Sequence, residues 1–300
     1  MRILVSGASG LVGGALVPRL CTSNHKVHFL RRGKRPDASA EEIYWDPTVG
    51  FPNEERALLE GINAVFHLAG EPVLGLWTKK KKRAIRDSRV GPTTVLSQTL
   101  ASLHTKPRAM ICASAIGYYG SRGDEALTEK SPAGNNFLGS VCQEWEAACE
   151  PARAAGIRVA NVRVGIVLSE RGGALKSMLP AFRMGVGGPL GDGSQYLSWI
   201  TLDDLIEALV YSVENENISG PVNGTAPNPI TNFDFTKALG RAVHRPTMFR
   251  VPAALLRLVG GGAADEMLLA SARVYPERLE AEGFVFRHPE INGALAATLG

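Results

Sequence analysis

A glycine-rich turn near the amino terminus constrains the fold of this chain more than any other feature. Residues 3–13 read ILVSGASGLVG, so a short apolar run leads directly into Gly7, Gly10 and Gly13. Such an apolar run is typical of a buried parallel strand, and an amphipathic helical pattern begins at Leu11. The sequence therefore predicts a strand, a tight turn and a helix in immediate succession.

This arrangement suits phosphate binding. Without a Cβ, glycine lets the chain turn tightly, lets the backbone approach a pyrophosphate, and lets the helix pack close to the strand. The start of the helix also presents unpaired N–H groups and the positive end of its dipole. We therefore expect a dinucleotide at this turn; the alternative is an ordinary glycine-rich turn of an α/β domain.

A pair of arginines follows the second predicted strand, which reads KVHFL over residues 26–30. A site that selects NAD usually ends this strand with Asp or Glu, which binds the ribose 2′-hydroxyl. Here Arg31 and Arg32 stand at that position, and Lys34 and Arg35 come shortly after. A guanidinium pairs with a 2′-phosphate in bidentate fashion, whereas a carboxylate would repel it. The pair predicts NADP(H) rather than NAD(H); the alternative is a solvated basic turn.

Strand and helix patterns alternate along the first half of the chain, which predicts a doubly wound parallel sheet of the α/β Rossmann type. After about residue 165, glycine clusters and short apolar helical pieces replace this alternation. We expect a nucleotide-binding domain over residues 1–165 and a smaller C-terminal α/β domain on the substrate side over residues 166–300. Residues 222–224 are a candidate strand that returns to the main sheet. A helical pattern over residues 79–103 contains Gly91-Pro92, where we expect a kink or a new turn.

Composition excludes several classes of protein. With 300 residues, 45% of them hydrophobic, the chain can bury a sizeable core. A net charge of +4 does not indicate nucleic-acid binding, and the one dense basic run, over residues 79–83, is typical of an exposed helix start. Four cysteines without metal-ligand spacing predict reduced thiols and no metal site. Without a secretory signal, these thiols predict a cytoplasmic protein. No apolar run reaches membrane-spanning length, so we expect no membrane span.

Beyond these features, the chain resembles the extended short-chain dehydrogenase/reductase superfamily. More narrowly, it resembles the atypical branch described as epimerase-family NADP-dependent oxidoreductases, some of which are labelled cell-division-inhibitor-like. The resemblance covers essentially the whole length. The segments that carry it are SGASGLVG (6–13), VFHLAGE (65–71), DSRVGPT (87–93), SAIGYYG (114–120), VRVGIVL (162–168), GVGGPLGDG (185–193), WITLDDL (199–205) and YPERLEAEGFVFRHPEINGAL (275–295).

The resemblance implies a set of cofactor-binding residues. The residues that would contact the pyrophosphate are Gly7, Ser9, Gly10, Leu11 and Val12, and those that would contact the adenosine 2′-phosphate are Arg31 and Arg32. The residues that would lie along the adenosine are Leu68 and Ala69. Glu71 and Arg89 would face the cofactor, and Val167 would flank the nicotinamide. Plain strand-end packing is the alternative for Leu68, Ala69 and Val167.

The catalytic pair of this superfamily is missing from the chain. Its enzymes carry a Tyr-x-x-x-Lys pair on one helical face, where the lysine favours the tyrosinate form and the phenol acts as acid or base. The corresponding helix here begins FLGSV, so Phe137 and Val141 replace the pair. No Tyr-x-x-x-Lys occurs anywhere in the 300 residues.

Two residues could replace the missing pair. Ser114 follows the fourth main strand, where the superfamily has its catalytic serine, although Ala115 competes for that register. Tyr118 lies four residues further on, in a loop expected to enter the cleft. It could donate a proton, or it could be a loop aromatic that packs beside the ligand.

Other polar and aromatic residues fit structural roles better. His67 precedes a strand end and is best explained as a core histidine with satisfied hydrogen bonds. Glu144 and Glu146 are interpreted as an exposed helix face. Trp199 could form a wall of the substrate pocket.

Two functions remain open at this point. The first is an NADP(H)-dependent oxidoreductase or epimerase-like enzyme, with an unidentified small-molecule substrate and an unconventional proton donor. The second is an NADP(H)-binding regulatory or redox-sensing protein without turnover. Relatives often pair through their long helices, so a homodimer is the expected assembly, with neither nucleic acid nor membrane as a partner.

Overall fold

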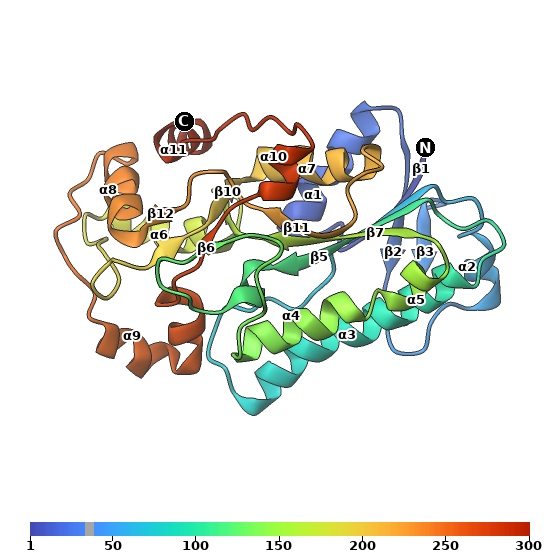
Figure 1. Ribbon diagram of the computed structural model, residues 1–300, viewed down its shortest axis with the longest axis horizontal. Coiled ribbons are helices and arrows are strands. Elements are labelled where there is room, and N and C mark those ends of the chain that lie inside the picture. The colour runs from blue at the N-terminus through green and yellow to red at the C-terminus, as the bar shows by residue number, and fades with distance from the viewer. Residues whose placement is uncertain (34–38) are drawn as a thin grey trace.

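A parallel sheet of seven strands organises the larger part of the molecule (Figure 1). The structure is a computed structural model that describes residues 1–33 and 39–300, so Lys34 and Arg35 lie outside the described residues. The strand order is β11-β7-β5-β4-β1-β2-β3, which confirms the predicted doubly wound fold. The strands are β1 (Arg2–Ser6), β2 (Lys26–Arg31), β3 (Glu42–Tyr44), β4 (Ala64–His67), β5 (Ala109–Ala115), β7 (Arg158–Val164) and β11 (Gly220–Gly224).

Helices cover both faces of this sheet. Figure 1 shows α1, α7 and α10 above the sheet and α3, α4 and α5 below it, while α2 lies at the β3 end. Their bounds are α1 (Leu11–Thr22), α2 (Asn53–Ala57), α3 (Lys79–Ala101), α4 (Phe137–Ala147), α5 (Glu150–Ala154), α7 (Leu202–Glu214) and α10 (Glu277–Ala281). The sheet is therefore the middle of three layers, with an apolar core on each side.

β1 shows why its apolar run predicts a central strand. Ile3 and Val5 pack into the core shared with α1 and α7, whereas Leu4 packs into the core shared with α3. All three side chains are fully buried. Because successive residues of a strand face opposite sides, only a strand covered on both faces needs such an unbroken run.

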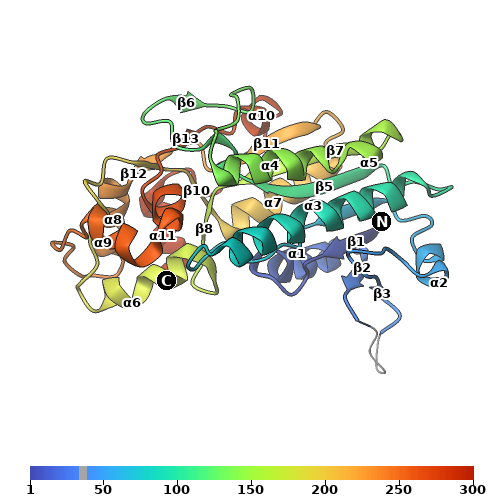
Figure 2. The ribbon, with the colours of Figure 1, turned by 90° about the horizontal axis from the view of Figure 1, so that it is seen from below.

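The helix α3 is continuous through its proline. Residues Lys79–Ala101 form one helix that contains Pro92, without a new start at Gly91-Pro92 (Figure 2). Ile85, Leu96 and Leu100 are fully buried on both sides of the proline. Packing of this apolar face outweighs the backbone hydrogen bond that proline removes.

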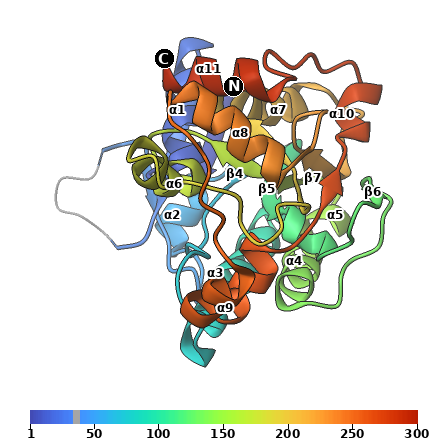
Figure 3. The ribbon, with the colours of Figure 1, turned by 90° about the vertical axis from the view of Figure 1, so that its left-hand side faces the viewer.

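The remaining segments form a smaller C-terminal part, seen end-on in Figure 3. Its strands are short and pair in twos: β8 (Ile166–Leu168) with β10 (Trp199–Thr201), β9 (Tyr196–Leu197) with β12 (Ile230–Thr231), and β13 (Arg273–Val274) with β6 (Ala126–Leu127). Its helices are α6 (Gly173–Arg183), α8 (Asn232–Ala242), α9 (Ala253–Gly260) and α11 (Ile291–Leu299), with the single turn η2 (Ala264–Leu268). A second single turn, η1 (Ile116–Tyr119), directly follows β5.

The structure divides the chain differently from the predicted domains 1–165 and 166–300. α7 packs its apolar face into the core around β1 and α1, and β11, which includes residues 222–224, pairs with β7 at the sheet edge. Residues 202–224 therefore belong to the sheet layers. Residues 166–201 and 225–300 apart from α10, with β6 from the first half, build the smaller part. No helix within residues 1–33 and 39–300 combines the length and the apolar character needed to cross a bilayer.

Candidate functional site

The glycine turn after β1 is shaped by contacts too close for a side chain. Gly7 has a φ of +75°, and a Cβ there would lie 2.8 Å from the backbone nitrogen of Ala69. A Cβ on Gly13 would lie 2.3 Å from the carbonyl oxygen of Gly7, which also accepts a hydrogen bond from the N–H of Gly10 at 3.0 Å. The turn therefore packs between the end of β4 and the start of α1 at distances that glycine allows.

The first turn of α1 leaves its N–H groups without a side-chain partner. Its N-cap is Gly10, no side chain accepts a hydrogen bond there, and no acidic residue lies in the first turn. Leu11 and Val12 pack their side chains against the core, so they can offer a ligand only their backbone. Unpaired N–H groups and the positive helix end therefore face the loop that contains Ser9, as phosphate binding requires.

A pocket of about 270 Å³ lies beside this turn, at the carboxyl ends of β1, β2 and β4. The predicted residues that line it are Gly7, Ser9, Arg31, Arg32, Ala69 and Glu71. Sequence reasoning missed Trp45, Pro47, Ser88 and Pro92, which complete its wall. Trp45 directly follows β3, the neighbour of β2, and that adjacency is the one signal that could have found it.

Four other predicted residues do not line the pocket. Leu11, Val12, Leu68 and Val167 pack at the edge of the core around β1 and α1. Leu11 also approaches the loop after β8, since a Cβ on Gly172 would lie 3.4 Å from its Cδ1. The structure thus brings the segment of Val167 to the start of α1, as a cofactor that extends from the turn would require.

The two arginines after β2 have different surroundings. Arg31 donates from Nε to the Glu42 carboxylate of β3 at 3.1 Å, and this carboxylate is mostly buried. Arg32 is exposed and has no ion pair within residues 1–33 and 39–300. Glu42 therefore holds Arg31 against the sheet, while the guanidinium of Arg32 remains available to an anion in the pocket.

The predicted residues Glu71 and Arg89 both lie at the section of the pocket wall around Gly70. Glu71 lines the pocket, and the Lys81 ammonium, 2.9 Å from its carboxylate, lowers the pKa of Glu71. Arg89 does not line the pocket but lies close to the wall residue Gly70, where a Cβ would be 3.2 Å from its Cζ. Its guanidinium stacks 5.0 Å from the centroid of the Trp145 ring, and burial lowers its pKa.

His67 has the satisfied core position that its sequence context indicates. The ring is fully buried, with Nδ1 2.6 Å from the Ser6 hydroxyl and Nε2 3.0 Å from the Thr93 hydroxyl. Thr93 donates its own proton to the carbonyl of Arg89, so Nε2 of His67 donates to Thr93 and Nδ1 accepts from Ser6. Burial lowers the pKa of His67 from 6.5 to about 4. The ring is therefore neutral and structural.

This histidine predicts a loss of stability in mild acid. The unfolded chain takes up a proton on His67 below about pH 6.5, whereas the folded chain resists it down to about pH 4. Between pH 7 and 4.5, His67 should lower the free energy of unfolding by about 2.5 kcal/mol. Denaturant unfolding at both pH values should show a smaller drop for His67→Gln than for the wild type. The exposed His104→Gln is the control, and an equal drop in all three proteins would contradict the assignment.

The helix face that carries the catalytic pair in the superfamily is filled with packed side chains. The Phe137 ring meets the Trp77 ring edge-on at 5.3 Å, and the Lys82 ammonium lies 4.8 Å from the Phe137 centroid. Val141 is 2% exposed. Glu266 of η2 accepts hydrogen bonds from the backbone N–H of Phe137 and of Leu138, which joins the C-terminal part to the start of α4.

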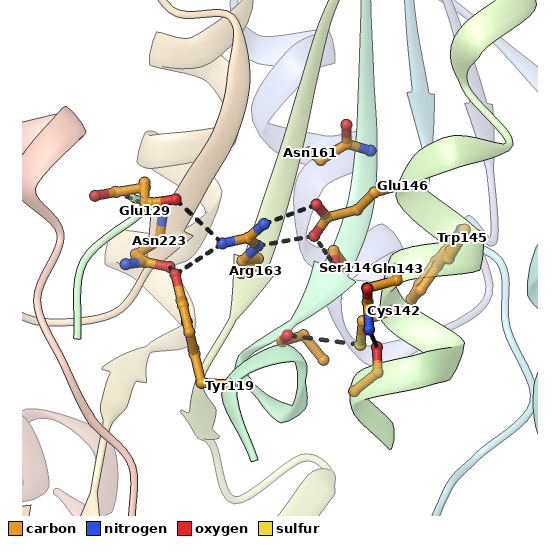
Figure 4. A network of polar contacts seen from close by, with 12 residues as sticks. Ser114, Tyr119, Glu129, Cys142, Gln143, Trp145, Glu146, Asn161, Arg163 and Asn223 are labelled. Atoms are coloured by element: carbon orange, nitrogen blue, oxygen red, sulfur yellow. Dashed lines mark hydrogen bonds and ion pairs between the residues drawn. The ribbon is translucent and has the colours of Figure 1, made fainter. Parts of the chain in front are cut away.

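A buried ion pair lies below this face (Figure 4). Arg163 of β7 donates from Nε and from a terminal nitrogen to the two carboxylate oxygens of Glu146, each at 2.8 Å. Their side chains are 3% and 14% exposed. Burial opposes the charge of Arg163, but the hydrogen bonds and charge of Glu146 raise its pKa. The exposed-face interpretation is therefore wrong for Glu146; it holds for Glu144, whose half-exposed carboxylate pairs with Arg86.

The same network contains Ser114 and its neighbouring tyrosines. Ser114 is 4% exposed and donates its hydroxyl to Glu146 at 2.7 Å, so it faces α4 and does not line the cofactor pocket. Tyr119 is fully buried, and its hydroxyl accepts from Arg163 and donates to Asn223. Burial raises the pKa of Tyr119 to about 12.

Tyr118 is less enclosed than its neighbour. The Arg163 guanidinium carbon lies 3.4 Å from the centroid of its ring, which is a direct stack. Its side chain is partly buried. Among the described residues, none forms a hydrogen bond with its hydroxyl. Of the two predicted catalytic residues, only Tyr118 therefore has an uncommitted polar group.

Trp199 does not form a pocket wall, so that expectation is wrong. Its side chain is fully buried in the core of the C-terminal part, with Leu179, Phe182 and Phe235. Its ring N–H donates to the carbonyl of Asn228 at 3.1 Å. The apolar contacts of α6 and α8 enclose it, which periodicity along a single short strand does not reveal.

Comparison with known proteins places these features in a family. The model of the NAD dependent epimerase/dehydratase family matches residues 3–223, and a domain of unknown function, DUF1731, matches residues 251–298. An epimerase family protein of Mycobacterium tuberculosis is 42% identical over 294 residues, which cover 98% of this chain and 96% of that protein.

Solved structures agree with the sequence comparison. The crystal structure of human epimerase family protein SDR39U1 (isoform 2) with NADPH has a TM-score of 0.90 and 31% identity, and the match covers 100% of this chain and 99% of that one. A nucleoside-diphosphate sugar epimerase from Corynebacterium glutamicum has a TM-score of 0.81 and 39% identity, with 100% of this chain and 58% of that one covered. The predicted resemblance is confirmed: this chain belongs to the NAD dependent epimerase/dehydratase family.

Proposed function

We propose that the protein is an NADP(H)-dependent oxidoreductase or epimerase-like enzyme that works without a Tyr-x-x-x-Lys pair. The observation that carries this proposal is the pocket that the glycine turn before the uncapped start of α1 forms with Arg31 and Arg32. The helix start complements a pyrophosphate, and the arginines complement a 2′-phosphate. The NADPH in the structure of the human relative supports the same cofactor for this chain.

Bound in this site, NADP(H) would supply or accept a hydride. The residues of the chain bind and orient it. Gly7 and Gly13 allow the backbone to approach the pyrophosphate, and Glu42 holds Arg31 in place beside the pocket. Glu71, which pairs with Lys81, forms part of the pocket wall.

For the proton that accompanies the hydride, the geometry favours Tyr118 over Ser114. The Tyr118 hydroxyl is uncommitted and its ring rests on Arg163, so it can donate to a substrate oxygen. Ser114 already donates its hydroxyl hydrogen to Glu146. We therefore assign Ser114 as a positioning residue, which acts through Glu146 and Arg163.

The first experiment tests which cofactor the protein binds. Fluorescence titration should give Arg32→Gln an NADPH Kd about 10–100-fold above the wild type, because one charge-assisted contact is lost, with the NADH Kd unchanged. The exposed Arg83→Gln, which changes the net charge equally, should bind NADPH as the wild type does. Equal loss for NADPH and NADH would contradict the 2′-phosphate assignment.

The same proteins should then be offered aldehydes, ketones and nucleotide sugars while NADPH consumption is followed. Tyr118→Phe should lower turnover of any accepted substrate at least tenfold, with NADPH affinity kept. Ser114→Ala should have a smaller effect. Unchanged rates in both variants would contradict these roles.

A second function is favoured by one observation. Phe137 and Val141 fill the place of the catalytic pair with packed apolar side chains. This supports an NADP(H)-binding regulatory or redox-sensing protein without turnover. Tight NADPH binding with no consumption on the whole panel would favour that function over the enzyme.

A further inference from the structure

The end of the molecule that carries α6, α8 and α9 exposes most of the large apolar side chains that face solvent (Figure 3). Among the described residues, 13 large apolar side chains are exposed, and eight of them belong to this end. They are Met184, Val186, Phe233, Met248, Phe249, Leu255, Leu258 and Val259. Single exposed apolar residues are normal, but such a concentration at one end marks a place of contact with a partner.

The helix α9 is not buried by the rest of the fold. Six of its eight residues are alanine, leucine or valine, yet none is buried. Leu255, Leu258 and Val259 are spaced so that they share one helical face, and they are 50%, 82% and 72% exposed. The one charged residue of the helix, Arg257, pairs with Asp265 at 2.8 Å. A helix this short gains little stability from its backbone alone, so its apolar face is suited to a partner.

The segment between α8 and α9 continues this apolar face. Its Met248 and Phe249 are 82% and 61% exposed. Arg245 of the same segment donates from Nε to the carbonyl of Arg183, which brings the exposed Met184 beside it. Figure 3 shows the segment crossing the front of the molecule toward α9. We call the surface that these residues form with α9 the α9 surface.

The α9 surface is also basic. Residues 232–262, which contain α8 and α9, carry five Lys and Arg residues and one Asp, so their net charge of +4 equals that of the whole chain. Arg241, Arg245 and Arg250 are exposed. In the part of the chain that the structure describes, none of these three forms an ion pair with a carboxylate. Exposed apolar side chains therefore stand among arginines whose charge no carboxylate balances.

We propose that the α9 surface binds an anionic lipid membrane peripherally. The apolar side chains of α9 and of Met248 and Phe249 enter the boundary between headgroups and acyl chains, and the arginines contact the anionic headgroups. Leucine and phenylalanine beside arginine is the composition that such interfacial segments have. Binding of this kind needs no membrane-spanning helix, and it is independent of the cofactor site.

A second copy of this chain is the competing occupant. A symmetric contact would bring the arginines of the α9 surface close to those of the other copy, and like charges repel. An anionic lipid surface complements the same charges. The apolar face of α9 is convex, as on any helix, so a protein partner would need a matching groove, whereas a fluid lipid surface adapts to it.

The test is sedimentation of the full-length protein with large lipid vesicles. Vesicles of phosphatidylcholine with about 30% phosphatidylglycerol should bind the wild type at about 0.1 M salt, and vesicles of phosphatidylcholine alone should bind it at least tenfold more weakly. Arg250→Gln should lower the partition coefficient about fivefold, because one basic contact with the anionic surface is lost. Lys106→Gln removes an exposed charge in the loop before β5 and should bind within about twofold of the wild type.

A matched pair of aspartate variants tests the apolar contact. Leu258 and Val285 are 82% and 83% exposed, and Val285 lies between α10 and α11, far from α9 in Figure 1. Leu258→Asp should lower the partition coefficient at least tenfold, whereas Val285→Asp should change it less than about twofold. Because both side chains are exposed, both variants should keep the thermal unfolding midpoint of the wild type.

Three results would overturn the proposal. The first is absence of wild-type binding to the anionic vesicles. The second is an equal loss in both members of either matched pair, which would mean attraction by net charge alone. The third comes from light scattering without vesicles, where Leu258→Asp should leave the molecular mass unchanged. A wild-type dimer that this variant dissociates would assign the α9 surface to a second copy instead.

Discussion

Replacement of Gly13 by alanine should abolish measurable NADPH binding. The new Cβ would lie 2.3 Å from the carbonyl oxygen of Gly7 and 2.8 Å from Cα of Ala8, both backbone atoms of the turn. Since neither is a flexible side chain, the turn or the start of α1 must move. That movement displaces the N–H groups that would meet the pyrophosphate. We expect the NADPH Kd to rise more than 100-fold and the free energy of unfolding to fall by about 1–3 kcal/mol.

The neighbouring glycine provides a matched control. A Cβ on Gly14 would lie 3.7 Å from the carbonyl oxygen of Ala8, an ordinary contact. Gly14→Ala should therefore keep NADPH binding and raise stability by about 0.5–1 kcal/mol, because alanine favours the helix. The two variants are compared by fluorescence titration and chemical unfolding. If Gly13→Ala binds NADPH within twofold of Gly14→Ala, the close packing of the turn does not control the cofactor site.

The glycine turn between β1 and α1 could be predicted from sequence because the interactions that shape it are local. The apolar run of β1, the glycines and the helical pattern after them lie within 20 residues, and each has a short-range physical reason. The arginine pair after β2 is similar, since strand order places that strand end beside the turn. Short strands such as β9, β12 and β13 form only across the C-terminal part, so their two-residue patterns carry no comparable signal.

The buried polar network shows what sequence reasoning could not reach. Glu146 lies on a helix with polar neighbours, and helical spacing alone makes it look exposed. Its partner Arg163 lies 17 residues away, inside the mostly buried strand β7. Only the pairing of β5 with β7, which sets Ser114 beside Arg163, brings the three residues together. An arginine inside a buried strand was the available sign that a carboxylate had to be near.

Removal of Arg163 should be the most destabilising single change in this network. Arg163→Met leaves the Glu146 carboxylate in a site that is 14% exposed, and it removes a hydrogen bond from Tyr119 and the cation beneath the Tyr118 ring. Breaking a buried ion pair by loss of one partner typically costs about 3–5 kcal/mol. We expect a loss of that size in the free energy of unfolding, measured by denaturant titration. If Tyr118 donates the proton, turnover per folded molecule should fall as well.

The double variant Arg163→Met/Glu146→Gln tests whether the loss belongs to the ion pair. Glutamine at position 146 keeps an acceptor for Ser114 but removes the carboxylate charge that has lost its partner. The double variant should therefore be more stable than the sum of the two single effects predicts. Arg86→Met is the matched control, because its partner Glu144 lies on the same helix α4 and both side chains are 40–48% exposed. That change should cost less than about 1 kcal/mol, since water screens the pair. Strictly additive effects of Arg163→Met and Glu146→Gln would show that burial of each side chain, rather than their pairing, holds α4 against β7.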